Sequence, residues 1–120
     1  MVLIDTGPIV ALVDKADKTH KKAIAIFRTF QTSPLTTWAC LTEAFYFVGE
    51  ACGWRGQKAL LELLTRGAIR VHSQTYKEID RISELMEQYH DNPMDFADAS
   101  LVTIAELRGA KRIFTIDSGF

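Results

Sequence analysis

The chain has 120 residues, 48% of them hydrophobic and 24% charged, and its formal net charge is −1. A length of this order suits one domain spanning residues 1–120, and the composition is typical of a protein that buries one core. With so little net charge, the chain as a whole gives no sign of a nucleic-acid or membrane partner. A local basic patch on a neutral protein can still bind nucleic acid.

The apolar patterns predict strands and helices in alternation along the chain. Short continuous apolar runs indicate buried strands, and apolar residues at helical spacing indicate helices that bury one face. In chain order we expect a strand at 1–4, helices at 9–13 and 17–30, a strand at 35–37, helices at 38–48 and 56–65, a strand at 68–72, helices at 75–89 and 95–107, and a strand at 112–116.

Capping residues and glycines predict where several of these helices begin and end. Thr75 and Glu78 have the spacing of a capping box at a helix start, and Gly49, Gly67 and Gly109 follow helical segments, where helices commonly end. Strands separated by helices imply βαβ crossovers, so we expect an α/β fold with a mainly parallel sheet. The chain stops directly after the last strand and its turn, and a missing C-terminal strand is one interpretation of this ending.

Other features of the sequence indicate the cytoplasm. No stretch reaches the roughly 20 apolar residues that a membrane helix needs, and Asp5 with Gly7 and Pro8 interrupts the apolar run of a secretory signal. Cys40 and Cys52 have no histidines at metal-ligand spacing, so we interpret them as reduced, small apolar residues. We therefore expect a cytoplasmic protein without a membrane partner.

Two expected strands end in the same way, with an aspartate directly after an isoleucine. Asp5 follows Ile4, and Asp117 follows Ile116. Ligands of open parallel sheets bind at the carboxyl ends of the strands, so the two aspartates would face each other if their strands were neighbours. For either aspartate alone we favour the structural explanation, a turn residue or a helix cap. As a pair, they favour a functional site.

Glu43 is the only charged residue between Arg28 and Glu50, and it lies in the almost entirely apolar segment 38–48. A carboxylate on such a helix is costly unless it is paired or binds a cation. A buried salt bridge or a narrow solvent-facing stripe would explain it structurally. We favour the functional interpretation.

Asp95 and Asp98 have the spacing of a helix N-cap and the third helical residue, where the helix dipole stabilises negative charge. Capping explains Asp95 fully. It explains Asp98 less well, because the nearly continuous apolar stretch 99–105 follows. We therefore predict that Asp98 is the functional acid and that Asp95 is mainly the cap.

Several carboxylates in one cleft repel one another and raise one another's pKa unless a cation neutralises them. Sets of oxygen ligands suit hard ions such as Mg²⁺ and Mn²⁺, which can activate water for attack at phosphorus. The acids thus predict metal-dependent hydrolysis of a phosphodiester.

Two other enzyme classes share part of this pattern. Asp5-Thr6-Gly7 also occurs in aspartic proteases, but these are rich in β-structure, whereas this chain has several helical patterns. Phosphatases of the haloacid dehalogenase type need a second aspartate where this chain has Gly7.

Four segments in this order, Met1–Leu12, Glu43 within its helix, Met94–Val102 and Ile113–Asp117, resemble the PIN domain, most closely in VapC-type toxins of toxin–antitoxin pairs. The resemblance implies a three-layer α/β/α fold with a parallel sheet, and RNA cleavage that depends on Mg²⁺ or Mn²⁺. It places the catalytic and metal-binding acids at Asp5, Glu43, Asp98 and Asp117, with support from Thr6, Asp95 and Thr115. The implied partners are the RNA substrate, a small antitoxin whose tail enters the active-site groove, and a second copy in a homodimer.

The chain departs from the family at its end. Gly119 stands where many members have a further aspartate, and the sequence stops at Phe120 where the family usually continues into one more strand. The alternative function is therefore a PIN-like domain that no longer cuts and serves as an RNA- or protein-binding module.

The remaining charged and aromatic residues have structural interpretations as their default. Six basic residues could form an RNA-binding rim but are more simply the solvated faces of helices: Lys18, Lys21, Lys22, Arg108, Lys111 and Arg112. Four aromatic residues are interpreted as core or dimer surface in preference to base-stacking platforms: Trp38, Phe45, Tyr46 and Phe47. His20, His72 and His90 show no metal-ligand spacing and are assigned no role.

Overall fold

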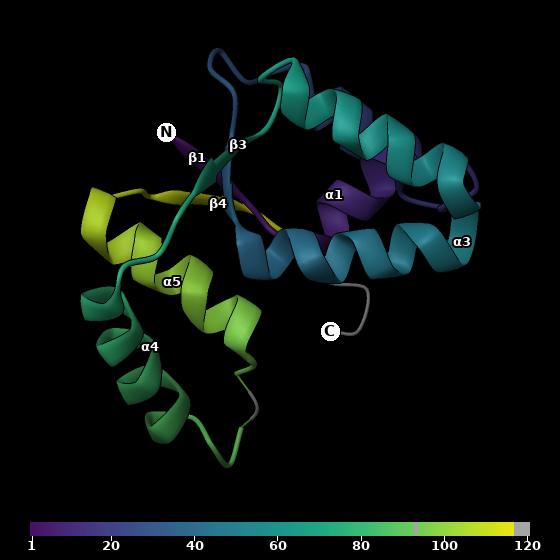
Figure 1. Cartoon of the computed structure of the whole chain (residues 1–120). Coiled ribbons are helices and arrows are strands. Elements are labelled where there is room, and N and C mark those ends of the chain that lie inside the picture. Colours follow the sequence, from purple (N-terminus) through teal and green to yellow (C-terminus); the bar gives the residue numbers. More distant parts are fainter. Residues whose placement is uncertain (93, 117–120) are drawn as a thin grey trace.

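The structure is a computed structural model that describes residues 1–92 and 94–116 (Figure 1). Strands and helices alternate as the sequence predicts. In chain order the elements are β1 (Val2–Ile4), α1 (Thr6–Val13), α2 (His20–Phe27), β2 (Leu35–Thr37), α3 (Trp38–Thr65), β3 (Arg70–His72), α4 (Tyr76–Gln88), α5 (Phe96–Arg108) and β4 (Arg112–Phe114).

The four strands form one parallel sheet in the order β3-β2-β1-β4. In this register Leu3 lies opposite Leu35 on one side and opposite Ile113 on the other. β1 and β4 are therefore neighbours, as the paired aspartates require. The carboxyl ends of all four strands share one edge, where parallel sheets bind their ligands.

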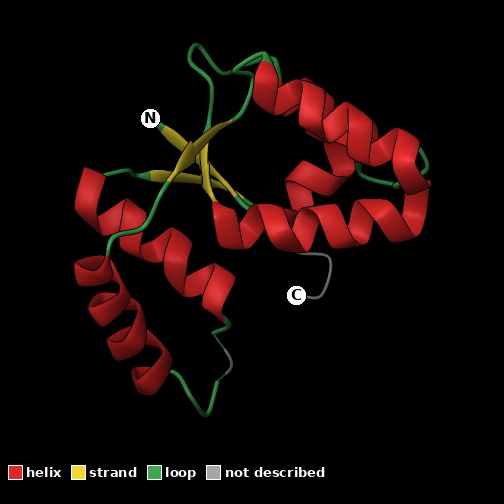
Figure 2. Ribbon diagram, in the orientation of Figure 1, coloured by secondary structure: helices red, strands yellow, loops and turns green. Residues whose placement is uncertain are grey.

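Helices cover both faces of the sheet, and Figure 2 shows the strands between two groups of helices. Val2 and Ile4 point into a core formed with α1, α2 and α3, whereas Leu3 points to the opposite face and packs against Leu101 and Ile104 of α5. α4 packs on the outside of α5. This arrangement confirms the three-layer α/β/α fold.

The first helix begins earlier than the sequence patterns indicate. The Asp5 side chain accepts a hydrogen bond from the Thr6 backbone N–H, so Asp5 is the N-cap and the helix starts at Thr6 instead of Ile9. α2 is shorter than predicted, because Asp17 accepts two hydrogen bonds from Thr19 and holds the preceding residues in a turn.

The prediction that a helix ends at Gly49 is wrong. Gly49 lies within α3, which runs from Trp38 to Thr65 and changes direction at Gly53. Gly53 has φ +62°, a conformation that other residues adopt only with strain, and the two arms of α3 fold back on each other from there (Figure 1). The helix ends at Gly67 and Gly109, and the capping box at Thr75, are confirmed.

None of the helices in the described part of the chain has the length and apolar character needed to cross a membrane.

Candidate active site

Asp5 lies at the carboxyl end of β1, where the chain turns into α1. Its Oδ1 accepts the Thr6 backbone N–H at 2.8 Å, and its Oδ2 accepts the Thr115 hydroxyl at 3.1 Å. The second bond joins the ends of β1 and β4 through side chains. Both oxygens of this partly buried carboxylate are thus oriented by neutral donors, which leave its negative charge uncompensated.

Glu43 reaches the same place from the second turn of α3. Its Oε1 accepts the Thr6 hydroxyl at 3.0 Å, so Thr6 connects Glu43 with the cap of α1. Burial raises the pKa of the Glu43 carboxyl, the Thr6 hydrogen bond opposes this rise, and the negative charges of Asp95 and Asp5 add to it. Among the described residues Glu43 has no ion-pair partner, which removes the buried salt bridge as an explanation within that part of the chain.

Asp95 and Asp98 lie at the beginning of α5 and cap it reciprocally. The Asp98 N–H donates to Asp95 Oδ1 at 2.8 Å, and the Asp95 N–H donates to Asp98 Oδ2 at 3.4 Å. The prediction that Asp95 is a cap is confirmed, but Asp98 is part of the same capping box. Burial and the negative charges of Asp95 and Asp5 raise the pKa of Asp98 to about 6. The electrostatics therefore assign Asp95 to the acidic cluster as well as to the cap.

Asp117 and Gly119 lie outside the described residues. The segment that leads to Asp117 passes close to the start of α1, where a Cβ added to Gly7 would be 2.9 Å from the Ile116 backbone oxygen. A glycine is therefore required where these two segments approach each other.

The acids line an open groove of about 1240 Å³ at the carboxyl edge of the sheet. Its described lining residues come from the ends of β1 and β4, from α1 and the loop after it, from α3, from the end of α4 and the loop after it, and from α5. Six carboxylates line it: Asp5, Asp17, Glu43, Glu50, Asp95 and Asp98. The described residues of the groove include no lysine, arginine or histidine. An excess of negative charge in a groove of this kind favours a cationic ligand.

Sequence reasoning missed Asp17 and Glu50 as groove residues. Glu50 follows Glu43 by seven positions, two helical turns, and this spacing was a usable signal. Asp17 is engaged in its turn with Thr19, whose hydrogen bonds lower the pKa of Asp17. Within residues 1–92 and 94–116, no three acidic, histidine or cysteine side chains are close enough together to hold a metal ion. The complete ligand set with Asp117 stays a prediction.

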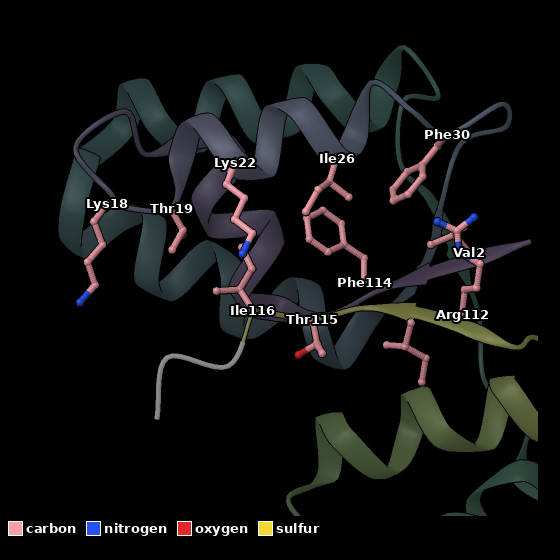
Figure 3. Close-up of a pocket in the computed structure, with 11 residues that line it drawn as sticks. Val2, Lys18, Thr19, Lys22, Ile26, Phe30, Arg112, Phe114, Thr115 and Ile116 are labelled. Atoms are coloured by element: carbon pink, nitrogen blue, oxygen red, sulfur yellow. The ribbon is translucent and has the colours of Figure 1, made fainter. Parts of the chain in front are cut away.

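A second hollow, of about 620 Å³, adjoins the acidic groove along β4 (Figure 3). The two share Ile113, Thr115 and Ile116 in their linings. Lys18 and Arg112 lie toward opposite ends of this hollow with Lys22 between them, and the Arg112 guanidinium lies 5.8 Å from the centre of the Phe30 ring. Three of the six basic residues considered for an RNA-binding rim thus line one hollow beside the acids, in contrast to Lys21, Arg108 and Lys111.

The fold and the groove define an α/β protein with an acidic site at the carboxyl edge of a parallel sheet. The sequence profile of the PIN domain matches residues 2–120, and the chain belongs to this family. It is 24% identical over 116 residues to ribonuclease VapC26 of Mycobacterium tuberculosis, a match that covers 97% of this chain and 86% of the relative.

A solved structure confirms the fold. The chain matches the crystal structure of VapC20 of Mycobacterium tuberculosis, described as a sarcin-ricin loop cleaving toxin, with a TM-score of 0.90 and 19% sequence identity. The match covers 99% of this chain and 92% of that one. The likeness to VapC-type proteins expected from the four segments is confirmed by the match to ribonuclease VapC26 over nearly the whole chain.

Proposed function

We propose that this chain is a metal-dependent ribonuclease that hydrolyses RNA phosphodiester bonds, with Asp5, Glu43, Asp98 and Asp117 as its catalytic acids. The observation that carries the proposal is the convergence of Asp5, Glu43 and Asp98 on one groove from three distant segments. The names of the relatives, a ribonuclease and an RNA-loop cleaving toxin, support the same chemistry.

The donor chemistry of the groove fits a hard divalent cation. Its ionisable side chains among the described lining residues, apart from Tyr89, are all carboxylates, and Mg²⁺ and Mn²⁺ prefer oxygen ligands. Burial, together with the negative charges of Asp5 and Asp95, raises the pKa values of Glu43 and Asp98, so a bound counter-charge would stabilise the ionised form of both acids. We propose Asp5, Glu43, Asp98 and Asp117 as the residues that would hold the ion. A bound ion of this type supplies a more acidic water and neutralises charge on the phosphate.

The chain's own contribution is to hold the acids in place before substrate arrives. Asp5 is fixed by Thr6 and Thr115, and Glu43 is fixed by the Thr6 hydroxyl. Thr6 thus supports two acids at once. Preorganised charged groups act in the reaction without rearranging, which is where much of an enzyme's rate advantage arises.

The second hollow, which we call the basic hollow because Lys18, Lys22 and Arg112 line it, offers a binding surface for the RNA on either side of the cleaved bond. We propose that Lys18, Lys22 and Arg112 contact backbone phosphates beside the cleaved bond, since phosphate contacts dominate nucleic-acid affinity. In this arrangement the neighbouring phosphates bind to the basic side chains in the hollow, and the phosphate that reacts lies at the acids in the adjoining groove.

By the same relationship we propose that the chain is the toxin of a toxin–antitoxin pair. Its partners would be a small antitoxin that occupies the groove and a second copy of the toxin. The exposed side chains of Trp38 and Tyr46 on α3 offer apolar area for contact with the second copy.

The test is cleavage of a labelled single-stranded RNA of random sequence by the purified chain. We expect cleavage with Mg²⁺ or Mn²⁺, none with EDTA, and recovery when the ion is restored. Asp5→Asn keeps an oxygen for the helix cap and should abolish cleavage, while Asp80→Asn on the exposed face of α4 should leave it unchanged. Full activity of Asp5→Asn would refute the site. RNA binding without cleavage by the unchanged chain would support the binding-module alternative.

A further inference from the structure

An aromatic side chain stands beside the acids in the groove, and the proposed catalytic machinery does not account for it. We propose that Phe47 stacks on an unpaired RNA base next to the cleaved bond and thereby positions the strand over the acids. This inference rests on the proposed ribonuclease function and adds a positioning residue to it.

The helix places Phe47 next to a catalytic acid. Glu43 and Phe47 are four residues apart on α3, so their side chains emerge on the same face of the helix, with about 5–6 Å between their Cβ atoms. Both line the acidic groove, and half of the Phe47 side chain is exposed, at 50%. A base joined to a phosphate at the acids is therefore within reach of this ring.

The ring is oriented by its neighbour. The Tyr46 ring packs against Phe47 edge-on, with 5.4 Å between the ring centroids and 74° between the ring planes. Contacts of this kind stabilise one orientation of an aromatic side chain. A ring held at a groove wall offers the flat surface on which proteins that bind single strands stack bases.

The charge of the groove favours a base over other occupants of this wall. Carboxylates repel phosphate, and the described lining residues include no basic side chain, so the side chains of the groove attract the RNA backbone only through a bound cation. The apolar lining residues are left to contact the bases. Tyr89 and Met94 also line the groove and add to its apolar surface. Unpaired bases fit such a surface, since every base has an apolar face.

The sequence favours core or dimer surface for Phe47 over a base-stacking platform. Its exposure contradicts the core interpretation, and our proposal takes the base-stacking alternative in place of the dimer surface. The exposed Trp54 and Tyr76 do not line the groove, at 64% and 93% exposure respectively. They provide control positions with aromatic side chains of similar or greater exposure.

The first experiment measures cleavage kinetics on a short RNA that carries the site preferred by the unchanged chain. We expect Phe47→Ala to raise KM about tenfold, which corresponds to the loss of one base–aromatic stack, with a smaller change in kcat. Phe47→Tyr should restore KM because it retains a flat ring, whereas Phe47→Leu should not. Trp54→Ala and Tyr76→Ala should behave like the unchanged chain. Equal KM values for Phe47→Leu and the unchanged chain would overturn the proposal, since bulk alone would then suffice.

The second experiment removes the base instead of the ring. Abasic nucleotides are placed one at a time along the same RNA, and each RNA is tested with the unchanged chain and with Phe47→Ala. An abasic nucleotide at one position beside the cleaved bond should raise the KM of the unchanged chain. The same abasic RNA should raise the KM of Phe47→Ala hardly any further, because the abasic nucleotide and the substitution remove the same contact. Additive losses at every position would overturn the stack.

Other outcomes separate this inference from the proposed function. If the unchanged chain cleaves RNA and Phe47→Ala matches it in KM, the ribonuclease stands and the inference fails. If Phe47→Ala weakens only the binding of an antitoxin peptide, the ring contacts protein and the RNA assignment is wrong. If the unchanged chain cleaves no RNA, both fall.

Discussion

Replacing Asp98 by asparagine should stabilise the metal-free protein while removing its activity. The ordinary pKa of this carboxyl is 3.8, and in the folded chain burial and the charges of Asp95 and Asp5 raise the pKa to about 6. The folded state therefore binds the proton more tightly than the unfolded state does. Above pH 6 Asp98 is charged in both states, and its charge opposes folding.

The size of the gain in the free energy of unfolding follows from the difference between the folded pKa of about 6 and the ordinary value of 3.8. Each unit corresponds to about 1.4 kcal/mol, which gives an upper limit of about 3 kcal/mol. Because Asp98 is only partly desolvated and more than a third of the residue stays exposed, solvent screens the repulsion, and we expect a gain of about 1 kcal/mol for Asp98→Asn. Asparagine keeps an oxygen that can accept the Asp95 N–H, so the capping box is largely retained. A gain of this size raises Tm by about 4 °C.

Thermal unfolding followed by circular dichroism, at pH 7.5 in EDTA, measures the effect. The gain should shrink as the pH falls from 6 toward 4, because the unchanged chain then takes up the proton and becomes more stable relative to the variant. Mg²⁺ or Mn²⁺ should raise the Tm of the unchanged chain more than that of Asp98→Asn. Asp80→Asn, on the exposed face of α4, is the matched control and should show neither effect. A lower Tm for Asp98→Asn than for the unchanged chain at pH 7.5 would refute the repulsion argument.

Three further predictions test the basic hollow and the backbone. Lys22→Gln should weaken RNA binding and reduce the salt dependence of log K by about 0.7, the effect of one phosphate contact on a single strand; Lys21→Gln, outside the hollow, should not, and equal effects in filter binding would contradict the assignment. Gly7→Ala should destabilise the protein by about 1–3 kcal/mol in urea unfolding, because the new methyl group would lie 2.9 Å from a backbone oxygen. Gly53→Ala should cost about 1–3 kcal/mol in the same assay, since its φ of +62° with ψ −154° is a backbone region that essentially only glycine populates; an unchanged midpoint for either variant would contradict the strain argument.

The sequence predicts the order of elements well, because short apolar runs and helical spacing are local signals. It fails where a distant contact decides. Gly49 resembles a helix end, but the first arm of α3 continues past it, and the reversal occurs at Gly53, which the local pattern does not distinguish. The start of α1 at Thr6 depends on Asp5 turning its side chain back to cap the helix.

The candidate site was predictable for a different reason. Charged residues at strand ends and in apolar helices conflict with local structural preferences, and such conflicts mark functional positions. Asp5 and Glu43 are of this kind. Phe47 is not, since an aromatic residue in an apolar helix conflicts with nothing, and only the groove gives it a possible role. The structure was also needed to show that Asp95 and Asp98 share both roles, because the two acids cap α5 reciprocally and both line the groove.

The hydrogen bonds around the acids explain how the groove fixes the positions of its carboxylates while their negative charge still opposes folding. Thr6 and Thr115 orient Asp5 and Glu43, and backbone N–H groups orient the acids at the start of α5. All of these donors are neutral, so they fix positions without cancelling charge. Lysine or arginine partners would have stabilised the fold more strongly but would have occupied the carboxylates. Neutral donors leave the negative charge available, and burial together with this uncompensated charge raises the pKa of Asp98, at a cost to the stability of the folded chain. If a cation recovers this cost on binding, its affinity should fall when Asp98 becomes protonated below pH 6.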